Sequence, residues 1–248
     1  MDKGLRKILL TLLFFSFGLP TFAQQENQLS IGVLASMATK PYKNTAQVRL
    51  VPSLSYQSQN LSLSLFEGMS YKLVSRDSLD VSFAIKPRME PYSEGESELF
   101  IGMKRSRTID LSVKTRLSVA RGTSIIINTA SEYTNEHNGQ EFDFALRQYL
   151  FGFSIPISTT VGVKRLSPNL SRFLYGVTDA ESLSDRPIFS PGSVNIPYVS
   201  ANSLFTLTDS LSLIGNARVN FYPNKIFKSP IVSERISISV LGGLSFTF

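Results

Sequence analysis

Apolar and polar residues alternate with a period of two along most of this chain. The final segment, RISISVLGGLSFTF at 235–248, places Ile236, Ile238 and Val240 on one parity and serines on the other. The segment 108–120 repeats the pattern, with isoleucine, leucine and valine opposite aspartate, serine, lysine and arginine. A period of two points successive side chains to opposite faces of an extended strand. The pattern therefore predicts an all-β protein whose strands each have an apolar and a polar face.

Turn-forming clusters separate the alternating segments and divide the chain into twelve predicted strands. Their ranges are 29–38, 46–57, 61–73, 78–88, 97–105, 108–120, 123–134, 141–153, 157–167, 194–207, 211–222 and 233–248. The segment 97–105, SELFIGMKR, alternates least clearly, and a short helix within a long connection is its alternative. Because single-chain outer-membrane barrels have an even number of strands, losing this strand would require losing a second one. Ten strands is therefore the alternative count.

The length of the strands favours a transmembrane barrel over a soluble sandwich. Sandwich strands also alternate, but they seldom keep the pattern for about ten residues or more. A tilted strand of about 9–11 residues crosses a bilayer, and a closed sheet leaves no unpaired backbone edge in lipid. Charges fall almost entirely on the polar parity, as expected because a lipid-facing Arg or Lys costs about 2–4 kcal/mol at the midplane. We predict an antiparallel up-and-down transmembrane β-barrel, with a β-bulge at Glu67-Gly68, where a charge interrupts the apolar parity.

The N-terminal residues have the composition of a secretory signal peptide. A basic stretch at 3–7 precedes an apolar run at 8–19, and a small-residue cleavage site ends at Ala23. We predict a signal peptide over 1–23 and a single outer-membrane barrel domain over 24–248. The chain contains no cysteine, so disulfides cannot stabilise the exported protein, and closure of the sheet is expected to do so instead.

The predicted strand order decides which connections share an end of the barrel. If both termini are periplasmic, TKPYKNTA, NEHNGQ and the long stretch 168–193 lie outside the cell, and SQN, RG, SIP and TDS form periplasmic turns. This arrangement matches the usual plan of short periplasmic turns and longer external loops. The connection at 87–97 is an exception, because it is long and yet falls on the periplasmic side in this assignment.

Four segments resemble those of one family of outer-membrane proteins. They are KPYKNTAQVRLVPSLSY, FLYGVTDAES leading to IFSPGS, SPIV, and the closing strand to Phe248. In order and spacing they resemble the MipA/OmpV family, also called the MltA-interacting protein family, of outer-membrane β-barrels. The chain departs from that pattern in having no Trp and in the segment YPNKIFK, where members tend to carry more acidic residues. The motif residues that carry the resemblance are Pro41, Tyr42, Tyr175, Gly176, Val177, Ser229 and Pro230.

The resemblance implies a location in the cell outer membrane, contact with its lipid and a structural role. It further implies a scaffold for murein-remodelling enzymes at the periplasmic side, with a murein hydrolase or synthase as the partner. No residue pattern identifies which enzyme that partner is.

The predicted lumen leaves a second hypothesis open, a narrow porin or small-solute channel with a weak preference for anions. More basic than acidic side chains point inward on the predicted strands, and basic rings in a pore favour anions. Small barrels also fill their interior with ion-paired side chains and then conduct little, so both a sealed and an open lumen remain hypotheses. The predicted inward basic residues are Arg49, Lys114, Arg116, Arg147 and Arg218, with Lys72 and Lys86 beside them.

Residue types needed for other chemistry are scarce. The one histidine, His137, lies in the polar loop NEHNGQ and is expected to be solvated rather than catalytic, and no Gly-x-Ser-x-Gly elbow occurs. One His and no Cys leave no metal-binding spacing, and no glycine-rich loop predicts a phosphate-bearing cofactor. The net charge of +6 is spread along the chain, which argues against nucleic-acid binding. We therefore expect a non-enzymatic protein without a cofactor or metal.

The C-terminal strand ends on an aromatic residue. Leu244, Phe246 and Phe248 share the apolar parity, and they resemble the C-terminal signal that the outer-membrane assembly machinery reads. Other aromatic residues lie near predicted strand ends, where amphipathic rings are expected to form girdles at the membrane interfaces. The predicted girdle residues are Tyr42, Tyr56, Tyr71, Tyr133, Tyr198, Phe221 and Tyr222.

Removal of Phe248 is expected to lower the amount of assembled barrel in outer-membrane fractions, because the assembly machinery would lose the terminal aromatic side chain. The measurement is the fraction of folded protein in isolated outer membranes, compared with the unaltered chain. An unchanged fraction would refute a signal role for Phe248.

Overall fold

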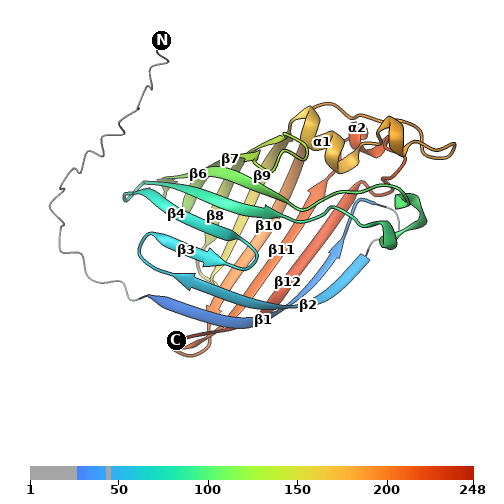
Figure 1. Cartoon of the computed structure of the whole chain (residues 1–248). Coiled ribbons are helices and arrows are strands. Elements are labelled where there is room, and N and C mark those ends of the chain that lie inside the picture. Colours follow the sequence, from blue (N-terminus) through green and yellow to red (C-terminus); the bar gives the residue numbers. More distant parts are fainter. Residues whose placement is uncertain (1–26, 43–45) are drawn as a thin grey trace, which may run out of the picture.

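The computed structural model describes residues 27–42 and 46–248, which form one closed antiparallel barrel (Figure 1). Each strand pairs with its neighbours in sequence, and β1 pairs with β12 from Ser30 to Ala38 to close the sheet. The predicted signal peptide, 1–23, lies outside the described residues. The strands are β1 (Gln28–Thr39), β2 (Ala46–Gln57), β3 (Leu61–Ser64), β4 (Gly68–Ser75), β5 (Leu79–Arg88), β6 (Thr108–Ala120), β7 (Thr123–Glu132), β8 (Gln140–Leu150), β9 (Ile157–Leu166), β10 (Val194–Thr206), β11 (Leu211–Phe221) and β12 (Ile236–Thr247).

The two faces of the sheet differ as the alternation predicts. On β6, Ile109 and Val113 are 40% and 42% exposed on the outside, whereas Asp110 and Ser112 are buried in the interior. A soluble protein could not leave such apolar rows in water on every strand, but lipid covers them at little cost. The prediction of an antiparallel up-and-down transmembrane β-barrel is therefore confirmed. None of the helices in the described ranges is long and apolar enough to cross a membrane.

The count of twelve strands is confirmed, but the predicted strand at 61–73 is wrong because the chain turns back within it. The side chain of Ser64 accepts the N–H groups of Phe66 and Glu67, at 3.3 and 3.4 Å, and starts the turn. Gly68 ends the turn at φ +75°, a left-handed conformation that glycine adopts at the lowest cost. The predicted bulge at Glu67-Gly68 is thus a hairpin turn between β3 and β4, and the register shift lies between Lys72 and Val74 instead.

The predicted strand at 97–105 is also wrong. One short 3₁₀ helix, Glu98–Phe100, lies in this segment and a second, Glu94–Glu96, directly precedes it; the side chain of Ser97 caps the helix at 98–100 by accepting the N–H of Leu99. Its apolar residues do not face lipid, because Phe100 and Met103 are fully buried in a core outside the barrel wall. The alternative, a short helix within a long connection, is the correct one.

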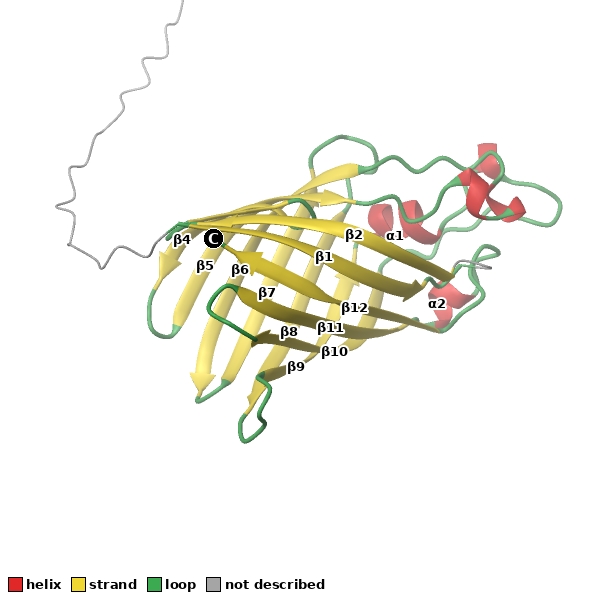
Figure 2. Ribbon diagram, turned by 90° about the horizontal axis from the view of Figure 1, so that it is seen from below, coloured by secondary structure: helices red, strands yellow, loops and turns green. Residues whose placement is uncertain are grey.

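The connections separate into two kinds by length (Figure 2). One end, called the turn end, carries the start of β1, the C-terminus and the short turns at 58–60, 76–78, 121–122, 151–156 and 207–210. The opposite end, called the loop end, carries the long connections, including 89–107, 167–193 and 222–235. Because β3 and β4 form an extra hairpin, β5 runs opposite to the predicted direction. The long connection that was predicted at the periplasmic side therefore lies with the other long loops.

The loop end is covered by a folded cap, made of Pro41 and Tyr42 with the connections 89–107, 167–193 and 222–235. Helices α1 (Pro168–Tyr175) and α2 (Asn224–Phe227) lie in this cap, beyond the ends of the strands (Figure 1). The side chain of Ser167 caps α1 by accepting the N–H of Leu170. The cap has its own hydrophobic core, which includes Tyr42, Tyr92, Phe100, Met103, Leu170, Tyr175, Val177, Ile226 and Ile231.

The cap and the turn end should be reached from opposite sides of the outer membrane. The chain has no cysteine, so Ile101→Cys, in an exposed part of the cap, gives a unique thiol. We expect a membrane-impermeant maleimide to label it in intact cells, because short turns of such barrels face the periplasm and long loops face outside. The matched control, Asp77→Cys in a short turn, should be labelled only after the membrane is permeabilised. The reverse result would contradict this orientation.

Candidate functional site

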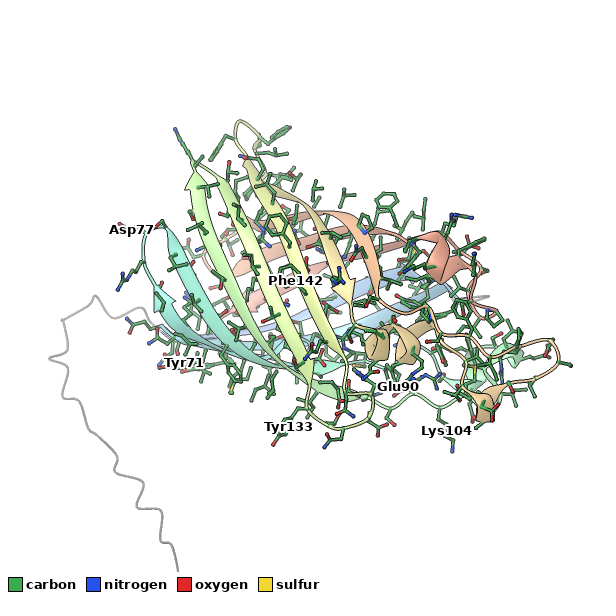
Figure 3. The ribbon with its side chains drawn as sticks, turned by 90° about the horizontal axis from the view of Figure 1, so that it is seen from above. Tyr71, Asp77, Glu90, Lys104, Tyr133 and Phe142 are labelled. Atoms are coloured by element: carbon green, nitrogen blue, oxygen red, sulfur yellow. The ribbon has the colours of Figure 1, made fainter. Side chains whose placement is uncertain are left out.

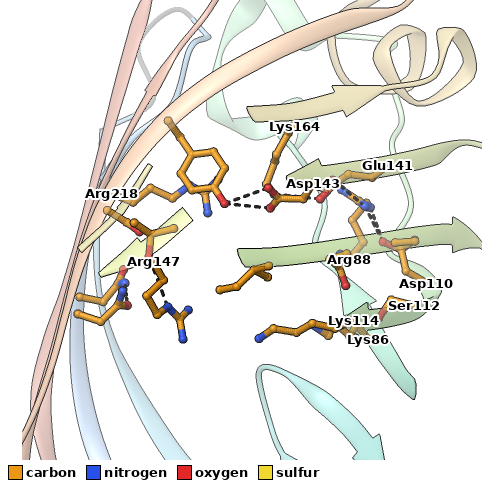
Figure 4. Close-up of a pocket in the computed structure, with 18 of the residues that line it drawn as sticks. Lys86, Arg88, Asp110, Ser112, Lys114, Glu141, Asp143, Arg147, Lys164 and Arg218 are labelled. Atoms are coloured by element: carbon orange, nitrogen blue, oxygen red, sulfur yellow. Dashed lines mark hydrogen bonds and ion pairs between the residues drawn. The ribbon is translucent and has the colours of Figure 1, made fainter. Parts of the chain in front are cut away.

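A cavity of about 550 Å³ lies in the lumen and is the candidate functional site (Figure 4). Residues of strands β5 to β11 line it. Six lining residues are basic and three are acidic, which gives an excess of three positive charges. The basic residues are Lys86, Arg88, Lys114, Arg147, Lys164 and Arg218, and the acidic ones are Asp110, Glu141 and Asp143.

Four of these charges form a network at the loop end of the cavity. Arg88 Nη2 lies 2.6 Å from Asp110 Oδ2 and 3.2 Å from Glu141 Oε2. Lys164 Nζ lies 3.0 Å from Glu141 Oε1. The two carboxylates are nearly buried, and buried charges are tolerated when they are paired and hydrogen-bonded in this way. The network connects β5, β6, β8 and β9 across the interior and narrows the lumen beneath the cap.

Tyr198 of β10 is the largest ring inside the cavity. Gly162 of β9 makes room for it, because a Cβ at Gly162 would lie 2.6 Å from Tyr198 Cζ. The Tyr198 hydroxyl donates to Asp143 Oδ1 at 2.9 Å, and the Arg218 guanidinium carbon lies 3.6 Å from the ring centroid, as in a cation–π contact. With 5% exposure, Tyr198 cannot belong to the membrane girdle predicted for it. Tyr42, at 4%, does not belong there either.

Besides Arg218, which lies over the Tyr198 ring, three basic side chains in the cavity have no acidic ion-pair partner among the described residues. Lys86, Lys114 and Arg147 form no ion pair within 4.0 Å in the part of the chain that the structure describes. Arg147 only makes a long contact of 3.5 Å with Thr160 Oγ1. Lys114 is repelled by both Lys86 and Arg147, and the labelled side chains share one part of the cavity (Figure 4). Clustered like charges of this kind require water or an anion between them.

The predicted inward basic residues do not gather in one place. Lys114, Arg147 and Arg218 line the cavity. Arg116 lies nearer the turn end, where it is paired with Asp80. Arg49 is exposed on β2 and is not among the lining residues of the cavity. The tertiary structure therefore divides the predicted set into a cavity group, an ion pair and one exposed residue.

The motif residues that carry the family resemblance meet in the cap. The Tyr42 hydroxyl donates to the carbonyl of Leu174 at 2.9 Å, and the Ser229 hydroxyl donates to the carbonyl of Tyr175 at 2.7 Å. The rings of Tyr42 and Tyr175 are 6.1 Å apart. Burial and the neighbouring Tyr222 hydroxyl raise the pKa of Tyr175 well above its usual value, so it stays a neutral member of the core. These residues thus connect three loops that are distant in sequence.

The remaining motif residues have backbone roles. Gly176 ends α1, and a Cβ there would lie 2.5 Å from the Arg172 carbonyl oxygen. Val177 pairs with Phe189, with N–H to O=C distances of 2.9 and 3.0 Å. The carbonyl of Pro41 accepts the N–H of Ser233 at 2.9 Å. Pro230 follows Ser229 between these contacts and is partly buried.

Two buried arginines hold the cap loops together. Arg105 donates to the carbonyls of Phe173 and Gly176 and pairs with Glu181. Burial opposes ionisation of Glu181, but hydrogen bonds from Arg105 and Thr178 outweigh it and lower the pKa of Glu181. Arg186, at 2% exposure, donates to the carbonyls of Leu99, Ile101 and Glu181. The sequence did not single out either arginine, since their carbonyl partners are distant in the chain.

His137 is buried rather than solvated, so the expectation for this loop residue is wrong. Its exposure is 9%, and its ring lies 4.4 Å from the ring of Phe173. Nδ1 accepts the N–H of Gly139 at 2.9 Å, which fixes a neutral ring, and burial lowers the pKa of His137. No group of three or more His, Cys, Asp or Glu residues that could hold a metal occurs within residues 27–42 and 46–248.

The predicted assembly residues lie at the outward edge of the turn end. Leu244, Phe246 and Phe248 are 47%, 45% and 70% exposed, and the two phenylalanine rings are 5.0 Å apart. The N–H of Phe248 donates to the carbonyl of Leu29 at 2.9 Å, beside the closing β1–β12 pair. Their role in assembly stays a prediction.

Comparisons with known proteins match this chain over almost its whole length. The family model for MltA-interacting protein MipA matches residues 31–248. The Escherichia coli K12 protein named "Putative outer membrane protein YiaT" is 22% identical over 237 residues, covering 94% of this chain and 96% of its own. The MltA-interacting protein of the same strain is 23% identical over 233 residues, covering 91% and 92%. The solved toluene transporter TodX of Pseudomonas putida has a TM-score of 0.43 at 7% identity, covering 91% and 90%.

The lumen network predicts a clear difference between two arginine substitutions. Arg88→Leu should destabilise the folded barrel by about 3 kcal/mol, because it leaves two buried carboxylates short of a cation. The control Arg107→Leu removes an exposed pair with Glu90 and should cost less than about 1 kcal/mol. Urea unfolding in lipid vesicles measures both. Equal losses would show that the Arg88 network is not held in a low-dielectric interior.

Proposed function

Because this chain belongs to the MltA-interacting protein MipA family, we propose that it is an outer-membrane scaffold whose turn end binds a murein-remodelling enzyme. The outer-membrane location follows from the transmembrane barrel and from the relatives. One relative, 23% identical to this chain, carries interaction with MltA in its name. That name supports a partner of the same kind for this chain.

The folded cap is the observation that carries the proposal. It covers the loop end with a core that includes the fully buried Phe100, Met103 and Ile226. The buried Arg105 and Arg186 connect its loops through several carbonyl groups. We infer that a cover with its own buried core hinders a direct route through the barrel, and a barrel covered at one end is better suited to present a surface than to pass solutes.

The turn end offers a contact surface of suitable chemistry. The turn at 151–156, FGFSIP, is the longest connection there, and it exposes Phe151, Phe153 and Ile155 by 59%, 62% and 43%. The guanidinium of Arg121 lies 5.1 Å from the Phe151 ring centroid. Aromatic and arginine side chains are the residues that most often dominate the binding energy of protein interfaces. We place the enzyme contact on this turn.

The proposed role is non-enzymatic. The described residues of the lumen pair their carboxylates with arginine, lysine or tyrosine, and His137 is held by Gly139 and Phe173 away from the cavity lining. We infer that the barrel contributes binding and position, and that the partner carries out the chemistry on murein.

The second candidate, a narrow anion-preferring channel, is favoured by one observation. The cavity has an excess of three positive charges and contains Lys86, Lys114 and Arg147 without acidic partners. Stable unitary currents of the refolded protein in planar bilayers would support this candidate. The scaffold proposal expects none, because the cap covers the loop end.

The scaffold proposal is tested by crosslinking in intact envelopes. A photoreactive amino acid at Phe153 should capture a murein hydrolase or synthase, identified by mass spectrometry, because the turn lies at the proposed contact. The same group at Ile188, which is 60% exposed in the cap, is the matched control and should capture none.

A substitution separates specific capture from chance proximity. Phe151→Ser should lower the yield of the crosslink from position 153 by about tenfold, as expected when an aromatic interface residue is truncated. If the photoreactive group captured no murein enzyme from position 153, or captured one only from position 188 in the cap, the scaffold proposal would be overturned.

A further inference from the structure

The barrel wall is incomplete beside β2. Strand β3 has only four residues, and β2 pairs with it from Ser55 to Gln57 alone. The last hydrogen bond across this pair runs from the N–H of Leu65 to the carbonyl of Leu54, at 3.2 Å. From 48 to 53, β2 pairs with β1 on one side and has no strand partner on the other. The β3–β4 hairpin therefore ends part-way along β2 (Figure 1).

Across the gap from the unpaired side of β2 lies the edge of β5. Its pairing with β4 ends at Ile85, opposite Met69, and residues 86–88 pair only with β6. Where the hairpin is present, three interstrand spacings of about 4.8 Å separate β2 from β5. Nearer the loop end, no strand fills this interval in the described part of the chain. We call this interval the side opening.

The lumen cavity reaches the side opening. Its lining includes Lys86 and Arg88, which have the inward parity of β5, and also Pro87, which has the outward parity, and Met89, which follows the strand. In an intact barrel wall, only inward-facing residues border the lumen. The contact with Pro87 places one border of the cavity at the free edge of β5, beside the side opening.

The outer rim of the side opening is apolar. Leu50 and Val48 are 77% and 75% exposed, the highest values among the large hydrophobic side chains that the structure describes. Leu65 and Phe66, at the tip of the hairpin, are 58% and 46% exposed. The rim thus continues the lipid-facing surface up to the edge of the opening (Figure 3 shows the outward side chains along the strands).

The inner side of the opening is basic. Lys86 and Lys114 point into the cavity without acidic ion-pair partners, and Arg49 lies on the inward parity of the unpaired part of β2. Glu67, at the hairpin tip, attracts Lys114 electrostatically. Lys86, Lys114 and Arg49 lack an acidic ion-pair partner among the described residues, and their positive charge favours an anion at this place.

Backbone groups on the free edges impose a second requirement. An unpaired N–H or C=O group in hydrocarbon costs several kcal/mol, so irregular or unpaired backbone at membrane depth must line a polar or water-filled space. The free edges of β2 and β5 meet this requirement only if polar groups enter the side opening. A lipid acyl chain alone would satisfy neither group, whereas head-group oxygens accept hydrogen bonds from the N–H groups and the water that accompanies a head group donates to the C=O groups.

We propose that the side opening binds a membrane amphiphile that has an acyl chain and an anionic head group. The head group enters the cavity between Lys86 and Lys114, where it replaces Glu67 as the counter-charge. The acyl chain passes over Leu50 and Val48 and stays in the bilayer. Because the cap covers the loop end and the side opening faces the bilayer, we expect the ligand to come from the membrane. This site does not depend on the enzyme contact proposed at the turn end.

The absence of Trp from the sequence gives a direct assay on the full mature chain. Leu50→Trp places a single fluorophore at the rim, and Phe144→Trp places one on the outward face of β8 as the matched control. In neutral detergent micelles, oleate brominated on its double bond should quench position 50 saturably. At position 144 it should quench only in proportion to its partition into the micelle. Saturable quenching of equal affinity at both positions would overturn the proposal.

Substitution of the basic residues is the second part of this quenching experiment. In the Leu50→Trp background, Lys86→Gln with Lys114→Gln should weaken the apparent affinity for brominated oleate by about tenfold or more, because two charge-assisted contacts are lost. Arg107→Gln, on the cap surface, should leave the affinity unchanged. The mobility of unheated samples on gels confirms that each variant is folded.

Two further measurements decide the chemical class of the ligand. Brominated oleyl alcohol, which has the same chain without the charge, should show no saturable quenching at position 50. Inorganic phosphate should not displace brominated oleate at the same concentration. Binding that is indifferent to both lysines, equal binding of the alcohol, or displacement by phosphate would each overturn the proposal.

Discussion

The need to pair every backbone N–H and C=O group in lipid is the constraint on which this structure depends. It requires the sheet to close, and the β1–β12 pair from Ser30 to Ala38 closes it. It also explains why charges stay on the inward parity, where water, ion pairs or the Tyr198 hydroxyl can satisfy them. The side opening beside β2 is the place where strand pairing leaves the constraint unmet, and for this reason it is the most informative part of the wall.

The two ends of the barrel differ in structure because their connections differ in length. The long connections are long enough to fold over the loop end, bury Phe100 and Ile226 and pair Arg105 with Glu181. The short turns cannot form such a cover, so the turn end remains accessible to a partner. The cap, the basic cavity and the side opening are the features that support the proposal of a barrel that binds at its wall and at one end.

Prediction from the sequence succeeded where one local rule decides the outcome. Period-two alternation located ten strands within a few residues, because an apolar and a polar face are needed wherever lipid covers one side. It failed at 61–73, where Ser64 and Gly68 form a turn inside a segment that otherwise alternates. It failed again at 97–105, where Phe100 and Met103 are apolar because they fill the cap core. The two errors cancelled in the strand count but reversed the direction of β5.

By itself, the sequence determined that the chain is an all-β transmembrane barrel with an apolar outer face, a basic interior and a family resemblance carried by motif residues such as Tyr42 and Ser229. Only the tertiary structure decided that these motif residues form a cap, that Tyr198 lies inside, that Arg116 is paired while Lys86 and Lys114 are not, and that the wall opens beside β2. The reason is physical: alternation depends on the solvent that each residue meets, whereas ion pairs, caps and free strand edges depend on segments distant in sequence.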